Sequence, residues 1–173
     1  MTQQNSELID ADNGIFLVLD VAFLKLFGPS LWQAKDINSP ESVGTAFSAF
    51  HEETKDVIAT LTLADVTGDE SEPDTNELDA ADIQRVDAFL RRAIESEVDV
   101  IEWQGSEQVR MTYLDAIGTQ YVDRRGARQW VNISIRVTHQ DRKFVAIGAF
   151  DKDWGGNLAA AVITSLKTLE FVD

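Results

Sequence analysis

The clearest pattern of hydrophobic and polar positions lies in the last third of the chain. Residues 130–138 alternate between apolar and polar side chains, which predicts a strand with one buried face and one face in water. Both faces of 143–150 are apolar, so this strand should be central in a sheet and covered on both sides. A helix with one apolar stripe should follow over 158–169, with Asn157 as its cap.

Earlier segments predict further strands and a second helix. Trp32 follows a Gly-Pro-Ser turn signal and should pack against the core. Asp79 is a suitable cap for a helix that runs to about Ser96 with one apolar stripe. A turn is expected at 104–106. The remaining strands are predicted from the apolar or alternating runs 15–27, 47–51, 57–63, 98–103 and 109–121.

Together these elements predict an α+β fold, an antiparallel sheet with helices on both faces (an α/β/α sandwich). The two helices should lie on opposite sides, because the strand at 143–150 needs cover on each face. We expect a polar N-terminal tail over 1–14 and one domain over 15–173.

Charge is distributed unevenly along the chain. The formal net charge is −15, and residues 1–82 hold 17 acids against 3 bases. Such a surface repels free nucleic acid and attracts a basic partner, although a merely solubilising acidic surface is the alternative. The segment 65–82 contains eight acids and no base, which predicts an exposed, mobile connection.

Composition restricts the chemistry. There is no cysteine and only two histidines, His51 and His139, which we expect at the surface. Thiolate nucleophiles, disulfides and Cys-ligated metals are therefore excluded, and no catalytic residue, metal site or cofactor is predicted. No apolar run is long enough to span a bilayer, and no secretory signal is visible, so a cytoplasmic protein is expected.

Two groups of charged residues are candidates for binding a partner. The acidic segment contributes Asp69, Glu70, Glu72, Asp74 and Glu77, which would steer a basic partner. A basic cluster contributes Arg124, Arg125 and Arg128. These arginines either pair with nearby acids or contact an acidic partner or the acidic loop of a second copy, which would make a homodimer. A hairpin should place them at the opposite end of the meander from Arg142 and Lys143.

The order of elements resembles the PsbP-like and DcrB-like family. The resemblance rests on the early tryptophan after Pro29 and on the strand 144–150 followed by the helix 158–169, and it has no signature motif. It implies a non-catalytic accessory protein that binds other proteins, such as a type VI secretion chaperone or an immunity-type protein.

The function predicted is therefore a non-catalytic protein-binding accessory module. The first alternative is a carboxylate-based, metal-assisted enzyme or a small-ligand-binding domain. It would require at least two of the acids at strand ends to meet in a concave pocket: Asp115, Asp123, Asp151 and Asp153. The second alternative is a structural subunit of a larger assembly.

Overall fold

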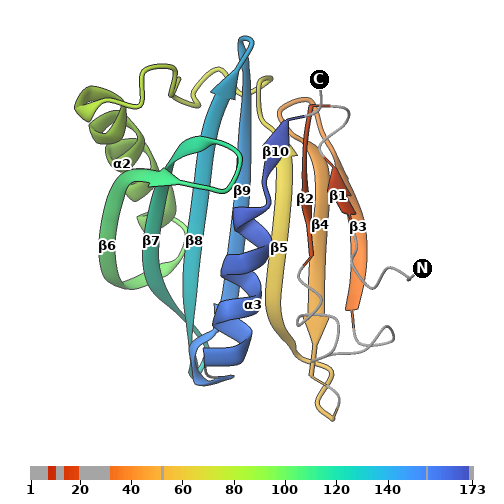
Figure 1. Cartoon of the computed structure of the whole chain (residues 1–173). Helices are drawn as coiled ribbons and strands as arrows, with labels where there is room; N and C mark the ends of the chain where they lie inside the picture. Colours follow the sequence, from red (N-terminus) through yellow and green to blue (C-terminus); the bar gives the residue numbers. More distant parts are fainter. Residues whose placement is uncertain (1–7, 11–13, 20–31, 52, 155, 172–173) are drawn as a thin grey trace.

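A seven-stranded antiparallel sheet forms the centre of the protein (Figure 1). The computed structural model describes residues 8–10, 14–19, 32–51, 53–154 and 156–171. From one edge to the other the strands are β3 (Trp32–Asn38), β4 (Val43–Phe50), β5 (Val57–Asp65), β9 (Arg142–Asp151), β8 (Arg128–His139), β7 (Asp115–Arg125) and β6 (Asp99–Arg110).

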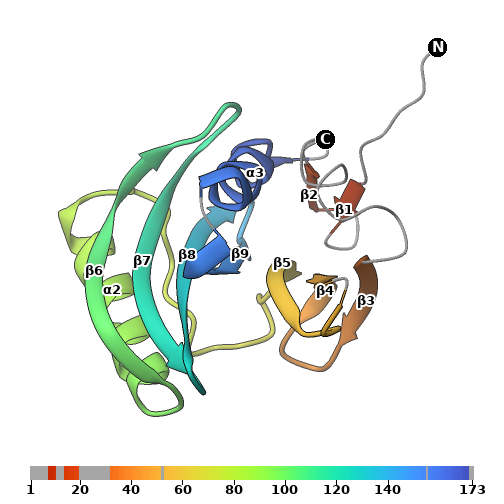
Figure 2. The same cartoon turned by 90° about the horizontal axis from the view of Figure 1, so that it is seen from below.

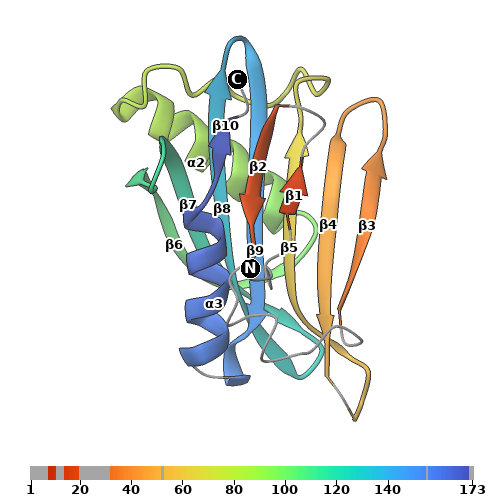
Figure 3. The same ribbon diagram turned by 45° about the vertical axis from the view of Figure 1, so that its right-hand side comes forward.

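Two different layers cover the sheet (Figures 1 and 3). The front layer combines helix α3 with a small three-stranded sheet in the order β1-β2-β10. The back carries helix α2, which packs mainly on β6. Viewed from below, β6, β7 and β8 curve strongly (Figure 2). The bounds are β1 (Leu8–Asp10), β2 (Ile15–Val18), β10 (Glu170–Phe171), α2 (Ala80–Glu95), α3 (Gly156–Lys167) and a short 3-10 turn η2 (Lys152–Trp154).

The apolar pattern of β9 is explained by its central place between β5 and β8. Phe144 and Phe150 belong to the main core cluster, and Gly148 lies directly under α3. On the opposite face Val145 and Ala149 are also buried. The predictions of a covered central strand and of helices on opposite faces are therefore confirmed.

Helix α2 begins where the sequence predicted. The Asp79 side chain accepts a hydrogen bond from the backbone N–H of Asp82, which satisfies one of the free donors of the first turn. Val86 and Leu90 are buried against the sheet, as their helical spacing requires. Asp82 is buried as well, and its carboxylate accepts hydrogen bonds from the backbone N–H groups of Glu77 and Leu78.

Several predicted boundaries are wrong. Leu8–Asp10, expected in a polar tail, forms β1 and pairs with β2. No turn occurs at 104–106, because β6 continues through it with two irregularities in pairing, and the chain turns at 111–114 instead. Asn157 lies within α3 and not before it. Residues 20–31 and the side chain of Trp32 lie outside the described part of the chain.

The predicted wet face of β8 is also wrong. Asn132, Ser134 and Arg136 are only 1%, 3% and 7% exposed. They lie on the back of the sheet, beside the area covered by α2, where the chain between β5 and α2 crosses β9 and β8. Residues 65–82 are therefore not the freely exposed connection that their charge predicted: Asp65 ends β5, and residues 80–82 begin α2.

Replacement of Gly148 should test how closely α3 packs on β9. A Cβ atom there would lie 2.6 Å from Val162 Cγ1 and 2.9 Å from Leu166 Cδ1, both in the core. We expect Gly148→Ala to lower the free energy of unfolding by about 1–3 kcal/mol in urea denaturation. Gly156→Ala in α3 is the control, because a Cβ there meets nothing within 4 Å, and it should be neutral or stabilising. Equal losses would contradict this packing.

Candidate partner-binding site

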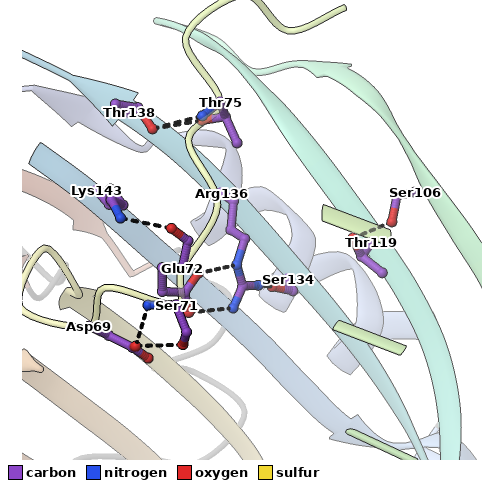
Figure 4. A network of polar contacts seen from close by, with 10 residues as sticks. All are labelled: Asp69, Ser71, Glu72, Thr75, Ser106, Thr119, Ser134, Arg136, Thr138 and Lys143. Carbon is purple, nitrogen blue, oxygen red and sulfur yellow. Dashed lines mark hydrogen bonds and ion pairs between the residues drawn. The ribbon is translucent and has the colours of Figure 1, made fainter. Parts of the chain in front are cut away.

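The acidic strap, defined as residues 66–79, is the most unusual part of the surface. It leaves β5 through a hydrogen bond from Val66 N–H to the carbonyl of Lys143, at 2.8 Å. It then runs over the back of β9 and β8 (Figure 4). Most of the contacts along the strap are hydrogen bonds and ion pairs, and near its end Leu78 packs against the apolar cluster under α2.

One buried ion pair attaches the middle of the strap to the sheet. Arg136 Nε and Nη2 donate to the two carboxylate oxygens of Glu72 at 3.0 and 3.1 Å, and Nη1 donates to Ser134 Oγ at 2.6 Å. The two charged side chains are only 8% and 9% exposed. A bidentate pair of this kind is strong and directional, and it fixes Glu72 above the centre of β8.

Further hydrogen bonds hold the strap on both sides of that pair. Lys143 Nζ donates to the carbonyl oxygen of Glu72 at 2.7 Å. Five residues before the helix begins, the backbone N–H of Thr75 donates to Thr138 Oγ1 at 3.0 Å, and Thr75 is 3% exposed. The acidic strap is therefore an ordered layer over β8 and β9.

The five predicted acids have different roles in the strap. Glu72 is used by the sheet. Asp69 Oδ1 accepts hydrogen bonds from Ser71 Oγ and N–H, which stabilise a local turn and lower the pKa of this carboxyl below its ordinary value. The remaining three, Glu70, Asp74 and Glu77, are exposed. They make no ion pair with any residue of the described chain.

The predicted arginines lie at the other end of β8. Arg125 and Arg128 face each other across the β7–β8 hairpin, whereas Arg142 faces His139 in the β8–β9 hairpin. Arg124 lies 3.9 Å from a carboxylate oxygen of Asp99. The structure therefore does not bring the acidic and the basic candidates together.

Arg125 and Arg128 are already paired with carboxylates of the sheet. Arg125 Nε donates to Asp123 Oδ2 at 3.1 Å, and its guanidinium stacks 4.3 Å from the centre of the Trp130 ring. Arg128 Nη1 donates to Asp151 Oδ2 at 2.5 Å. Both carboxylates are almost fully buried, at 0% and 1% exposure, so these pairs stabilise the end of the sheet.

The strand-end carboxylates do not converge on one pocket. Asp123 and Asp151 both pair with Trp130 in the sheet register, which places them about 10 Å apart, one strand spacing on each side of β8. Asp115 starts β7 at the opposite end of that strand, and Asp153 is exposed in η2. Within the described ranges, no group of three or more acids, histidines or cysteines is placed to hold a metal ion.

Both histidines are half-buried. His51 Nδ1 accepts hydrogen bonds from the N–H groups of Glu53 and Thr54 at 3.1 and 3.2 Å. The His139 ring stacks on Phe171, with 3.9 Å between ring centres. Each ring thus has a structural contact, and neither lies beside a serine or threonine in a nucleophile arrangement among the contacts of the described residues.

Sequence reasoning missed Arg136, the residue on which the strap depends. Its alternation with Val137 correctly placed it on the polar face of β8, but that face was taken to be solvated. The available signal was a run of acids without bases, together with one arginine between the hydroxyl residues Ser134 and Thr138. Their pairing joins positions 64 residues apart, which periodicity does not reveal.

Comparison with solved structures defines the fold. The chain has a PsbP-like fold, a mostly antiparallel sheet with two helices in the described chain. The solution structure of cyanobacterial PsbP (CyanoP) from Synechocystis sp. PCC 6803 matches with a TM-score of 0.60 at 13% identity. That match covers 98% of this chain and 95% of CyanoP.

A second structure has the same arrangement. LpqN of Mycobacterium tuberculosis, which is involved in cell envelope biogenesis, matches with a TM-score of 0.55 at 11% identity. The match covers 97% of this chain and 91% of LpqN. The sequence matches no protein-family model and no curated protein. Among the described helices, none has both the length and the apolarity that crossing a bilayer requires.

Removal of one member of the Arg136–Glu72 pair should destabilise the fold more than removal of both. We expect Glu72→Gln to lower the free energy of unfolding by about 3 kcal/mol, because it leaves a nearly buried guanidinium without its counter-charge. Arg136→Met should have a smaller effect, since a carboxylate on the strap can turn to water. The double variant Glu72→Met with Arg136→Met should recover to within about 1 kcal/mol of the original protein. Additive losses in this double-mutant cycle would show that the two residues are not coupled.

Acid should weaken the start of the strap through Asp65. Burial raises the pKa of this carboxyl, but hydrogen bonds from Thr67 and the ion pair with Arg142 outweigh burial and hold the pKa below 3.8. Its stabilising effect is therefore complete above the unfolded value and is lost as pH falls through the lower folded value. Asp65→Asn should reduce stability at neutral pH and leave stability well below pH 3.8 unchanged, as measured by urea denaturation at each pH. A pH-independent loss would contradict this linkage.

Proposed function

We propose that this protein is a non-catalytic accessory module that binds a protein partner with a basic surface. The observation that carries the proposal is that three contacts attach the acidic strap to the sheet. The Glu72 carboxylate pairs with Arg136, the Glu72 carbonyl accepts a hydrogen bond from Lys143, and the Thr75 N–H donates to Thr138. This attachment leaves Glu70, Asp74 and Glu77 exposed in a segment whose path is fixed. An ordered ridge of carboxylates loses less conformational entropy on binding than a mobile acidic loop would.

Electrostatics supports a basic partner. The exposed carboxylates of the strap add to a chain whose net charge is −15, and such a field accelerates the encounter with a positive surface. Its main effect falls on the association rate and on specificity, and it should weaken with salt. A secretion-associated chaperone or an immunity-type protein in the cytoplasm is the narrower role that we propose within this class.

The PsbP-like fold agrees with an accessory role. CyanoP and LpqN share this architecture at only 13% and 11% sequence identity. They therefore support the fold and do not identify the partner of this protein. The pairing of Asp123 and Asp151 with arginines removes the two most buried strand-end carboxylates from the candidates for acid–base chemistry.

Neutralising the outward acids should test the proposal. The triple variant Glu70→Gln, Asp74→Asn, Glu77→Gln should retain the fold, because none of these side chains makes an ion pair in the described chain. We expect it to lose a basic partner that co-purifies with the native protein at low salt, as measured by crosslinking and quantitative mass spectrometry.

A matched control removes the same charge elsewhere. Glu53, Glu97 and Glu102 are exposed and lie outside the strap, so their change to Gln should preserve capture. Equal loss in both variants would mean that only net charge matters. Unchanged capture across ionic strength in the strap variant would refute the strap as the binding surface. Light scattering of both variants would show whether the captured partner is a second copy of this chain.

A further inference from the structure

A trough lies on the front of the sheet, on the face opposite the acidic strap. It consists of two adjoining hollows of about 400 and 170 Å³ lined by residues of β6, β7 and β8. Five lining residues are common to both hollows: Glu107, Val109, Gln120, Ile133 and Ile135. The larger hollow is closed on its other side by Ile163, Leu166 and Lys167 of α3.

The trough exists because α3 covers only part of the front face. The helix packs on β9, and among the described helices none lies above the front of β6 and β7 (Figure 1). Gly118 removes a side chain from the floor, where a Cβ would lie 2.9 Å from Val109 Cγ1. Ile163 is 37% exposed on the helix side, so both walls present aliphatic surface to the hollow.

Two basic residues border one end of the trough. Arg110 ends β6 and Lys167 ends α3, and both line the larger hollow. A hydrogen bond from Thr112 N–H to the Lys167 carbonyl, at 3.2 Å, joins the β6–β7 turn to the end of the helix. Neither basic side chain forms an ion pair within the described residues.

These unpaired bases stand out in a chain with twice as many acids as bases, 30 against 15. Among the lining residues of the two hollows, the acid is Glu107. Glu107 lies three residues before Arg110 on β6, about 10 Å along the strand. Asp115 faces Arg110 in the β6–β7 register. The trough therefore has a basic end and an aliphatic middle, with Glu107 along one side.

We propose that this trough binds an amphiphile with one aliphatic chain and an anionic head group. The chain would lie between Ile133, Ile135 and Leu166, and the head group would contact Arg110 and Lys167. Pockets of this volume with apolar walls and a few polar groups are typical of small-molecule sites. An inserted peptide would bring backbone N–H and carbonyl groups that aliphatic walls leave unpaired, whereas an alkyl chain has none.

Binding of simple amphiphiles tests the proposal. Octanoate, decanoate and dodecanoate should bind to the whole chain in calorimetry below their micelle concentrations. Affinity should rise about fourfold for each added methylene, the factor that corresponds to about 0.8 kcal/mol. Dodecyltrimethylammonium, with the same chain and a positive head group, should bind more weakly than dodecanoate.

Variants locate the site. Ile163→Asp should abolish dodecanoate binding, because it places a carboxylate in the trough, and Val98→Asp is the control at an equally exposed apolar position outside it. Arg110→Gln with Lys167→Gln should weaken dodecanoate about fivefold and leave the effect of chain length unchanged. Lys152→Gln, an exposed base elsewhere, should not change binding.

Three results would overturn the assignment. The first is that dodecanoate shows no saturable binding. The second is that the Ile163→Asp variant binds dodecanoate as tightly as the original protein does. The third is that dodecanoate and dodecyltrimethylammonium bind with equal affinity. Thermal unfolding of each variant should show that it is folded before its binding is compared. The strap variant with neutral residues at 70, 74 and 77 should bind dodecanoate normally, so this proposal and the proposed protein-binding function fail or succeed separately.

Discussion

A guanidinium in the middle of a sheet must have a counter-charge once water is excluded, and in this protein the acidic strap supplies it. Arg136 is held in β8 by the sheet register and cannot turn away, so Glu72 and the backbone on either side of it must come to the sheet. That single requirement brings a highly acidic segment onto a buried polar face and gives it a defined path.

The pattern of apolar residues correctly predicted those elements whose apolar faces are all buried. β9 is apolar on both faces because it lies between β5 and β8 under two layers, and α2 and α3 each bury one stripe. The prediction failed for β8, whose alternation was read correctly but whose polar face is buried. Alternation reports which residues share a face. It does not report what covers that face, because the cover comes from a segment distant in sequence.

The edge strand β6 and the charged candidates show two other limits. Gly105, with a φ of +92°, lies in an irregularity that shifts the pairing by one residue, so a turn signal occurs in the interior of a strand. Among the candidates, charge alone identified the strap acids and the hairpin arginines. It could not separate Glu72, Arg125 and Arg128, which are used within the fold, from the three acids that project to solvent, because pairing depends on tertiary position.

The small front sheet has a consequence for how the molecule assembles. β2 lies between β1 and β10, and Thr168 Oγ1 accepts a hydrogen bond from the N–H of Val18, 150 residues away. Closing so large a loop is entropically unfavourable until the intervening sheet has already brought its ends together. We therefore expect the pairing of Ile15–Val18 with β10 to form late in folding. Until then the apolar side chains of this segment can associate with other unfinished chains.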